Sequence, residues 1–109
     1  MKTQEKNKAI AEWLGYECID NPLTPNMVSI KIDNYEKLWH PDKDRNQQKL
    51  IEDKLIEINC FVQYTYDDFK KEWEVYLDNS KNKTFTRQSE SKDIAFIDAV
   101  IELIQNEKA

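Results

Sequence analysis

The sequence predicts an α+β fold in which three helices pack against a small antiparallel sheet of three or four strands. Three segments repeat their apolar residues at helical spacing, while shorter segments between them alternate apolar and polar residues. The length of 109 residues fits one domain, residues 1–109, with a modest core. The expected order is α, β, α, β, β, an optional short β, and α.

The first elements are a helix and a strand separated by a turn. Residues 4–14 carry four apolar residues at helical spacing. Gly15, the one glycine of the chain, follows where a left-handed helix cap is needed. Residues 20–26 contain two prolines and predict a turn. Three β-branched residues then alternate with polar ones and predict a half-buried strand over 28–32.

An amphipathic helix is expected next, over residues 47–59, after a polar loop at 40–46. Asp44 and Gln47 have the spacing of a capping box, in which each side chain bonds the other residue's backbone N–H. This pair therefore marks the expected helix start.

Two alternating runs, residues 60–66 and 72–78, predict an antiparallel hairpin because a short polar turn joins them. A second turn at 78–83 leads to a candidate edge strand at 84–86. The last and most apolar helix is expected to begin after Ser91 as its N-cap, with Asp93 near its positive end.

The apolar positions of these elements define the expected core. Residues on the inward faces of helices and strands should be mostly buried: Trp13, Ile51, Leu55, Ile58, Val62, Trp73, Val75, Ile97, Val100, Ile101 and Ile104.

Charge and composition limit the classes of function that the protein can have. Twenty-one acidic residues against 16 basic ones give a net charge of −5, which disfavours direct binding of nucleic acid and favours a basic protein partner. No apolar run is long enough for a membrane span, and no apolar segment follows residues 1–8 as in a secretory signal. Cys18 and Cys60 are expected to be reduced thiols, so we expect a cytoplasmic location.

No pattern indicates catalysis. His40 is the only histidine, and neither cysteine lies at a metal-like spacing from it. The adjacent Asp67 and Asp68 are typical of a solvated turn. We therefore expect a protein that is not an enzyme and that binds no metal or cofactor.

The tripeptide His40-Pro41-Asp42 resembles the signature of J-domain co-chaperones, which stimulate Hsp70 ATPases. Leu14-Gly15 and residues 54–59 are similar to other parts of that family. This resemblance implies Hsp70 binding through His40, Pro41 and Asp42. It also implies a helix before the tripeptide, where the alternation at 28–32 predicts a strand.

A second resemblance covers about nine tenths of the chain. Residues 9–17, 41–51 and 91–103, with Trp73 in the strand between the last two, are similar to small phage and prophage proteins of the phage ABA sandwich type. The resemblance implies a sheet between helices. It implies no activity by itself. Small acidic phage proteins that lack catalytic residues often act by binding host machinery, and anti-CRISPR inhibitors are among them.

The leading hypothesis is therefore a counter-defence protein that binds a basic, nucleic-acid-handling host protein such as an RNA-guided nuclease. The expected contact residues are two aromatic anchors and nearby carboxylates: Phe69, Trp39, Asp67, Asp68, Glu72 and Glu74. The opposite expectation is that Phe69 folds back over the hairpin and Trp39 caps the sheet. Further alternatives are the J-domain co-chaperone, a small protein that captures a nucleotide signal, and an enzyme. The shortage of arginine weakens the nucleotide hypothesis.

Overall fold

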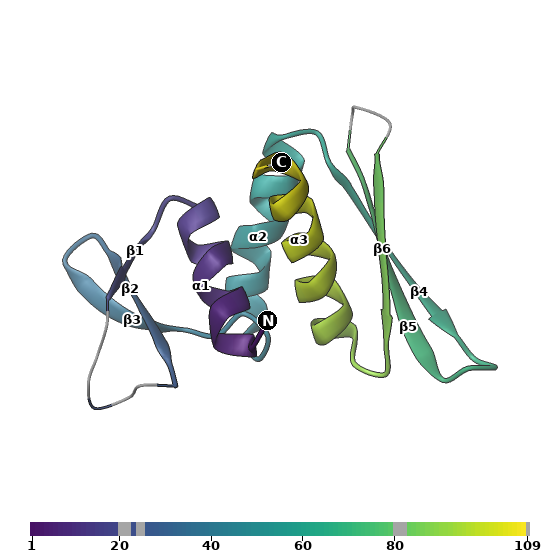
Figure 1. Ribbon diagram of the computed structural model, residues 1–109, viewed down its shortest axis with the longest axis horizontal. Coiled ribbons are helices and arrows are strands. Elements are labelled where there is room, and N and C mark those ends of the chain that lie inside the picture. The colour runs from purple at the N-terminus through teal and green to yellow at the C-terminus, as the bar shows by residue number, and fades with distance from the viewer. Residues whose placement is uncertain (20–22, 24–25, 80–82, 109) are drawn as a thin grey trace.

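The computed structural model describes residues 1–19, 23, 26–79 and 83–108, which form three helices and two antiparallel sheets of three strands each (Figure 1). One sheet has the order β1-β2-β3 and the other β4-β5-β6. The elements in chain order are α1 (Thr3–Trp13), β1 (Glu17–Ile19), β2 (Val28–Ile32), β3 (Tyr35–Trp39), α2 (Arg45–Glu57), β4 (Phe61–Asp67), β5 (Glu72–Asp78), β6 (Thr84–Ser89) and α3 (Lys92–Lys108).

The predicted α+β class and its three helices are confirmed, but the strands belong to two sheets instead of one. The strand expected at 28–32 is the central strand β2, with β1 and β3 paired on its two sides. Sequence periodicity missed both flanking strands. β1 has only three residues, and the first three of the five residues of β3 are exposed, so neither shows a clear alternation. The turns expected at 20–26 and 78–83 fall partly outside the described residues.

Helix α1 ends as the sequence predicts. Gly15 adopts φ +88°, its N–H donates to Glu12 O (3.0 Å), and the Tyr16 N–H donates to Ala11 O (3.0 Å). Two such bonds after a left-handed residue form a Schellman cap, which satisfies carbonyls at the end of the helix. A side chain at position 15 would be strained in this backbone conformation.

The same cap ends α2, without glycine. Asn59 has φ 59°, its N–H donates to Ile56 O (3.0 Å), and the Cys60 N–H donates to Leu55 O (2.8 Å). Asparagine tolerates the left-handed region better than most residues. The helix therefore stops at Glu57, two residues before the predicted end, and the chain enters β4 directly.

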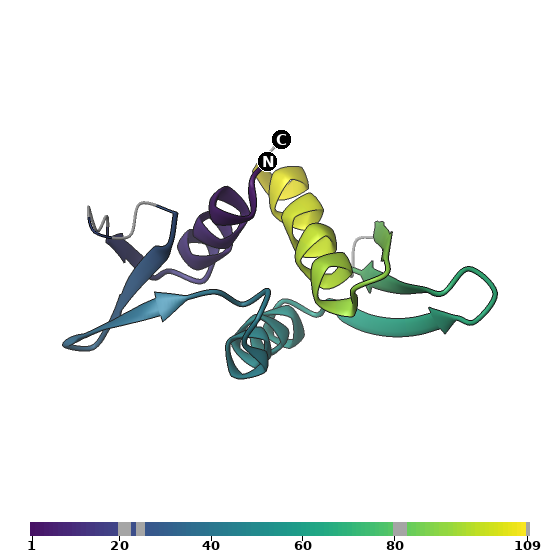
Figure 2. The same cartoon turned by 90° about the horizontal axis from the view of Figure 1, so that it is seen from below.

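The three helices lie between the two sheets, which occupy opposite ends of the molecule (Figures 1 and 2). Helix α1 lies beside the β1–β3 sheet, and α3 covers one face of the β4–β6 sheet. Lys6 of α1 and Asp98 of α3 form an ion pair of 2.6 Å. No helix in the described part of the chain is long and apolar enough to cross a membrane.

Side chains from all three helices and both sheets form the core. Most of the expected core residues are buried; four of them, Trp13, Ile58, Val62 and Trp73, are only half-buried. The most apolar face of α3 is buried along much of its length, through Ala95, Phe96, Ala99, Val100 and Leu103. The predicted N-cap is also present, since Ser91 Oγ accepts from the Ile94 N–H at 3.3 Å.

Truncation of the core face of α3 should destabilise the protein. Ile101 is 6% exposed, so Ile101→Ala should lower the free energy of unfolding by about 2–5 kcal/mol through lost burial and an unfilled cavity. Ile56→Ala is the matched control, because Ile56 is 70% exposed and should change stability by less than about 0.5 kcal/mol. Urea unfolding followed by circular dichroism measures both. Equal stability of wild type and Ile101→Ala would contradict the packing of α3.

Candidate functional site

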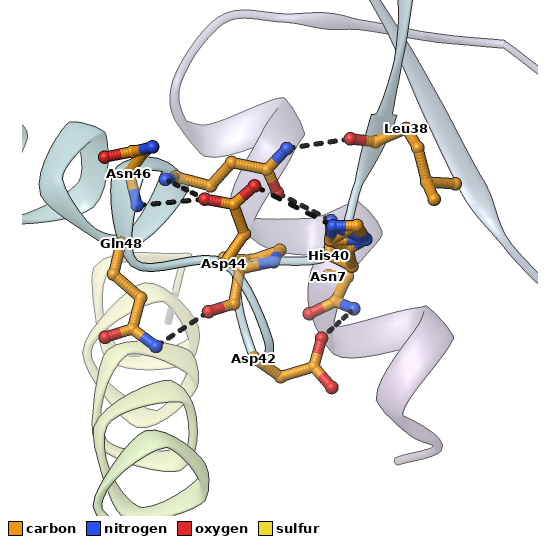
Figure 3. A network of polar contacts seen from close by, with 9 residues as sticks. Asn7, Leu38, His40, Asp42, Asp44, Asn46 and Gln48 are labelled. Carbon is orange, nitrogen blue, oxygen red and sulfur yellow. Dashed lines mark hydrogen bonds and ion pairs between the residues drawn. The ribbon is translucent and has the colours of Figure 1, made fainter.

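The loop between β3 and α2 contains the tripeptide of residues 40–42, and buried amides determine its conformation (Figure 3). Asp44 is the N-cap of α2, and its Oδ1 accepts from the N–H groups of Asn46 (2.9 Å) and Gln47 (3.2 Å). The expected return bond from Gln47 to Asp44 is replaced. Gln47 Oε1 accepts from the His40 N–H, and its Nε2 donates to Leu38 O, both at 2.7 Å. Gln47 therefore ties the end of β3 to the start of α2.

The same loop contacts α1 directly and is linked to α3 through Gln48 of α2. Pro41 is fully buried, and its carbonyl accepts from Gln48 Nε2 at 2.9 Å. Gln48 Nε2 also donates to Asp93 Oδ1 of α3 at 2.8 Å. On the other side, Asn7 Nδ2 of α1 donates to Asp42 Oδ1 at 3.0 Å (Figure 3). Residues 40–44 together with Gln48 of α2 thus connect all three helices.

The J-domain expectation is wrong for this chain. A J-domain needs a helix before the tripeptide, but residues 28–32 and 35–39 are the strands β2 and β3. Pro41 is buried, and the carboxylate of Asp42 is bound to Asn7 within the protein. The His40 side chain lies near the N-cap, with Nε2 3.8 Å from Asp44 Oδ2. The structure uses His40, Pro41 and Asp42 to join elements, not as an exposed Hsp70-binding motif.

Trp39, expected as an exposed anchor, is a core residue. Its side chain is 1% exposed, and the indole Nε1 donates to Asn7 O at 2.8 Å. The Tyr16 ring meets it edge-on, with ring centroids 5.7 Å apart. Trp39 is the last residue of β3 and faces α1, so the alternative that it caps the sheet was the correct one.

A pocket of about 330 Å³ lies beside this loop, between α1 and the start of β2. Amide side chains of Gln4, Asn7 and Asn26 line it, together with Lys43 and the carboxylate of Asp42. A carboxylate in the same pocket opposes the binding of a phosphate. The pocket therefore gives no support to the nucleotide-capture alternative.

Phe69 stands out from the turn between β4 and β5. It is 97% exposed, so the expectation that it lies at the surface is confirmed. Asp67 Oδ1 accepts from the N–H groups of Phe69 (3.0 Å) and Lys70 (3.1 Å), and Lys71 closes the turn with φ 58°. These bonds hold the turn backbone, so the exposed ring projects from a defined position. Asp68, also at the turn, is exposed, and its Oδ1 lies 3.9 Å from Lys71 Nζ.

The other expected acidic residues share one side of the β4–β6 sheet. Asp67 pairs with Glu72, and strand alternation places Glu74 on the same side. This side points away from α3, because the Tyr64 ring on the opposite side contacts Phe96 of α3 (centroids 6.0 Å apart). We call it the outer face, and its residues are Phe61, Gln63, Thr65, Asp67, Glu72, Glu74, Tyr76, Asp78, Thr84, Thr86 and Gln88.

The outer face carries uncompensated negative charge. Four of its eleven positions in β4, β5 and β6 are carboxylates, and none is lysine or arginine. Figures 1 and 2 show that no helix covers this face. Sequence periodicity alone did not identify Phe61, Tyr76 and Asp78 as residues of an exposed face. The alternation over 72–78 already placed Asp78 beside Glu72 and Glu74, but only the position of α3 shows which face is uncovered.

Two titratable side chains near the start of β4, Tyr64 and Cys60, have raised pKa values. Tyr64 donates from its hydroxyl to Glu52 Oε1 at 2.8 Å. Burial first, and this hydrogen bond second, raise the pKa of Tyr64 well above its ordinary value. Burial and the nearby charge of Asp78 likewise raise the pKa of the Cys60 thiol. Both groups therefore remain neutral at physiological pH.

The described residues contain no group of three or more His, Cys, Asp or Glu side chains arranged to hold a metal ion. Tyr66 of β4 and Trp73 of β5 lie opposite each other, and their ring centroids are 5.1 Å apart. Tyr76 is on the outer face and is not part of that contact.

No protein-family model matches the sequence, and no curated protein matches it. One solved structure is similar in fold: a phage protein from Bacillus cereus ATCC 14579, with a TM-score of 0.70 and 18% sequence identity. The fold of this chain therefore resembles that of a phage protein. The match covers 96% of this chain and 89% of the other, so it extends over both sheets. It agrees with the phage-protein resemblance seen in the sequence, at the level of the fold.

Removal of the Gln47 amide should destabilise the protein. Gln47→Ala would leave the His40 N–H and the Leu38 carbonyl without their partners in a poorly hydrated region, at a cost of about 2–4 kcal/mol in unfolding free energy. Gln105→Ala on the exposed side of α3 is the control and should have little effect. Chemical denaturation measures the difference. A wild-type stability for Gln47→Ala would show that the loop does not depend on this side chain.

Stability should fall at alkaline pH because of Tyr64 and Cys60. Their pKa values are raised in the folded state, so their contribution is complete below the unfolded values, about 8.5 for Cys and 10 for Tyr, and is lost as the pH rises above them. Tyr64→Phe removes one of the two groups, so its melting temperature should fall less steeply than that of the wild type between pH 8 and about 11. Parallel curves for the two proteins would contradict this assignment.

Proposed function

We propose that the protein is a phage or prophage protein of the phage ABA sandwich type, without enzymatic activity, that binds a host protein. Its target would be a basic, nucleic-acid-handling defence component such as an RNA-guided nuclease, inside the bacterial cell. The observation that carries the proposal is Phe69, which is 97% exposed and held in place by Asp67 beside an acidic sheet face.

An exposed aromatic side chain surrounded by charge is a typical interface anchor. It buries a large area on binding, while few rotatable bonds lose freedom. The turn is already fixed by the bonds to Asp67, so little ordering remains to be done when a partner binds. Acidic groups nearby would attract a basic partner and exclude acidic ones.

The fold supports the phage assignment, since the similar structure is that of a phage protein and the match covers both chains almost completely. The net charge of −5 fits a basic target. The non-enzymatic part of the proposal is supported by the tripeptide loop, where the Pro41 carbonyl and the Asp42 carboxylate are bonded to Gln48 and Asn7 within the chain.

The test is capture of partners from a bacterial lysate, followed by affinity measurements with the purified target. Phe69→Ala should weaken binding at least about tenfold without lowering the melting temperature, because the ring has no contact to lose in the free protein. Tyr35→Ala is the matched control: Tyr35 is 76% exposed but lies on the β1–β3 sheet at the other end of the molecule.

Binding should also weaken as salt is raised. Recovery of no defence protein or nucleic-acid enzyme would argue against the proposal, as would full retention of binding by Phe69→Ala.

A further inference from the structure

We infer that the free edge of β4 receives an extended segment of the partner, in which basic and apolar side chains alternate. This inference rests on the proposed function and specifies how the partner would be held. Strand addition of this kind gains affinity from main-chain hydrogen bonds and specificity from alternate side chains.

The edge of β4 is open and lacks the usual protection. β4 has seven residues and pairs only with β5, in an unbroken register from Phe61↔Asp78 to Asp67↔Glu72. Lysine, proline and bulges normally prevent an edge strand from pairing with another chain. β4 contains no lysine, no proline and no bulge.

The other sheet edges in the described chain differ. β1 has only three residues, β3 carries Lys37, and β6 carries Arg87, whose Nε lies 3.0 Å from Glu102 Oε2 of α3. Long edge strands without lysine, proline or bulges are the ones that accept a further strand, and the charged residue of β4, Asp67, lies at its end. Among the six described strands, this favours β4.

An apolar groove lies between α2 and the first half of β4, beside this edge. It has a volume of about 300 Å³ and is lined by Glu52 and Ile56 of α2 and by Cys60, Phe61, Val62 and Tyr64. Ile56 is 70% exposed and Phe61 is 75% exposed. Every second side chain of an added strand would point to this side. Apolar residues at those positions would cover Ile56 and Val62.

The remaining side chains of an added strand would continue the outer face. There they would lie beside Gln63, Thr65 and Asp67, with Glu72 and Glu74 on the next strand. Because this face has four carboxylates and no lysine or arginine, lysine or arginine fits these positions best. A second copy of β4 fits less well, since it would extend an acidic face with another acidic face.

The test uses a labelled synthetic peptide of nine alternating lysine and valine residues. A peptide of the same composition, with its lysines in one block and its valines in another, is the control. We expect the alternating peptide to bind and the block peptide not to bind. Binding of the alternating peptide should slow amide hydrogen exchange across residues 61–67. These amides are measured by NMR in the free and the bound protein.

A matched pair of variants separates the edge from general charge. Thr65 on β4 and Thr86 on β6 are both exposed, and both lie on the outer face, at opposite edges of one sheet. Thr65→Lys should weaken peptide binding about tenfold, because it places a cation beside the added strand. Thr86→Lys makes the same change in net charge and should weaken binding less than about threefold.

Other outcomes overturn the inference. Equal weakening by both lysine variants, or no protection of residues 61–67, would show diffuse attraction without strand addition. A homodimer that Thr65→Lys dissociates would show that a second copy occupies the edge. If Thr65→Lys fails to fold, Ile56→Lys replaces it, because Ile56 is exposed and lines the same groove.

The experiment also distinguishes the two proposals. A captured defence protein whose binding depends on Phe69 but not on Thr65 would keep the proposed function and reject strand addition. Binding of the alternating peptide at β4, with no defence protein recovered, would keep strand addition and reject the proposed function.

Discussion

The buried amide of Gln47 connects the part of the chain before residue 40 to the part after it. Its two hydrogen bonds fix the end of β3 relative to the start of α2, and Gln48 and Asn7 extend the same connection to α3 and α1. The two sheets share no strand, so no ladder of backbone hydrogen bonds joins them. Their relative position therefore depends on the helices between them and on this loop. The outer face remains exposed because α3 covers only one side of the β4–β6 sheet.

Strong local patterns predicted local structure well. The alternation of β-branched residues predicted β2 with its observed bounds, and the alternation around Trp73 predicted β5. Helix caps were also predicted correctly. Gly15 has the expected positive φ, and Asp44 accepts the expected backbone hydrogen bonds at the start of α2. β1 and β3 were missed because their pairing with β2 comes from tertiary structure and leaves little trace in such short, partly charged segments. Alternation along a strand shows which side chains share a face of the sheet. It does not show which sheet the strand joins.

The candidate site was predictable where it depends on a turn and not where it depends on packing. Phe69 lies between turn residues, and that position favoured exposure while leaving open that the ring folds back over the hairpin. Trp39 lies beside a polar loop in the sequence, yet it is the last residue of a strand that faces α1 and is buried. Residues 40–42 match the J-domain tripeptide in sequence only. That motif requires a preceding helix, and here it follows the strand β3. The open edge of β4 was not predictable, since it requires knowing that β4 has one strand neighbour.

The division into two sheets also bears on how such a protein diversifies. Each sheet is formed by strands that follow one another in the chain, with β1 to β3 before the tripeptide loop and β4 to β6 after it. A lengthened hairpin or an altered strand at one end therefore leaves the register at the other end unchanged. Substitutions at opposite ends share no contacts, so we expect their effects on the free energy of unfolding to add. Exposed positions at the β4–β6 end can therefore change while the helices and the β1–β3 sheet keep their packing.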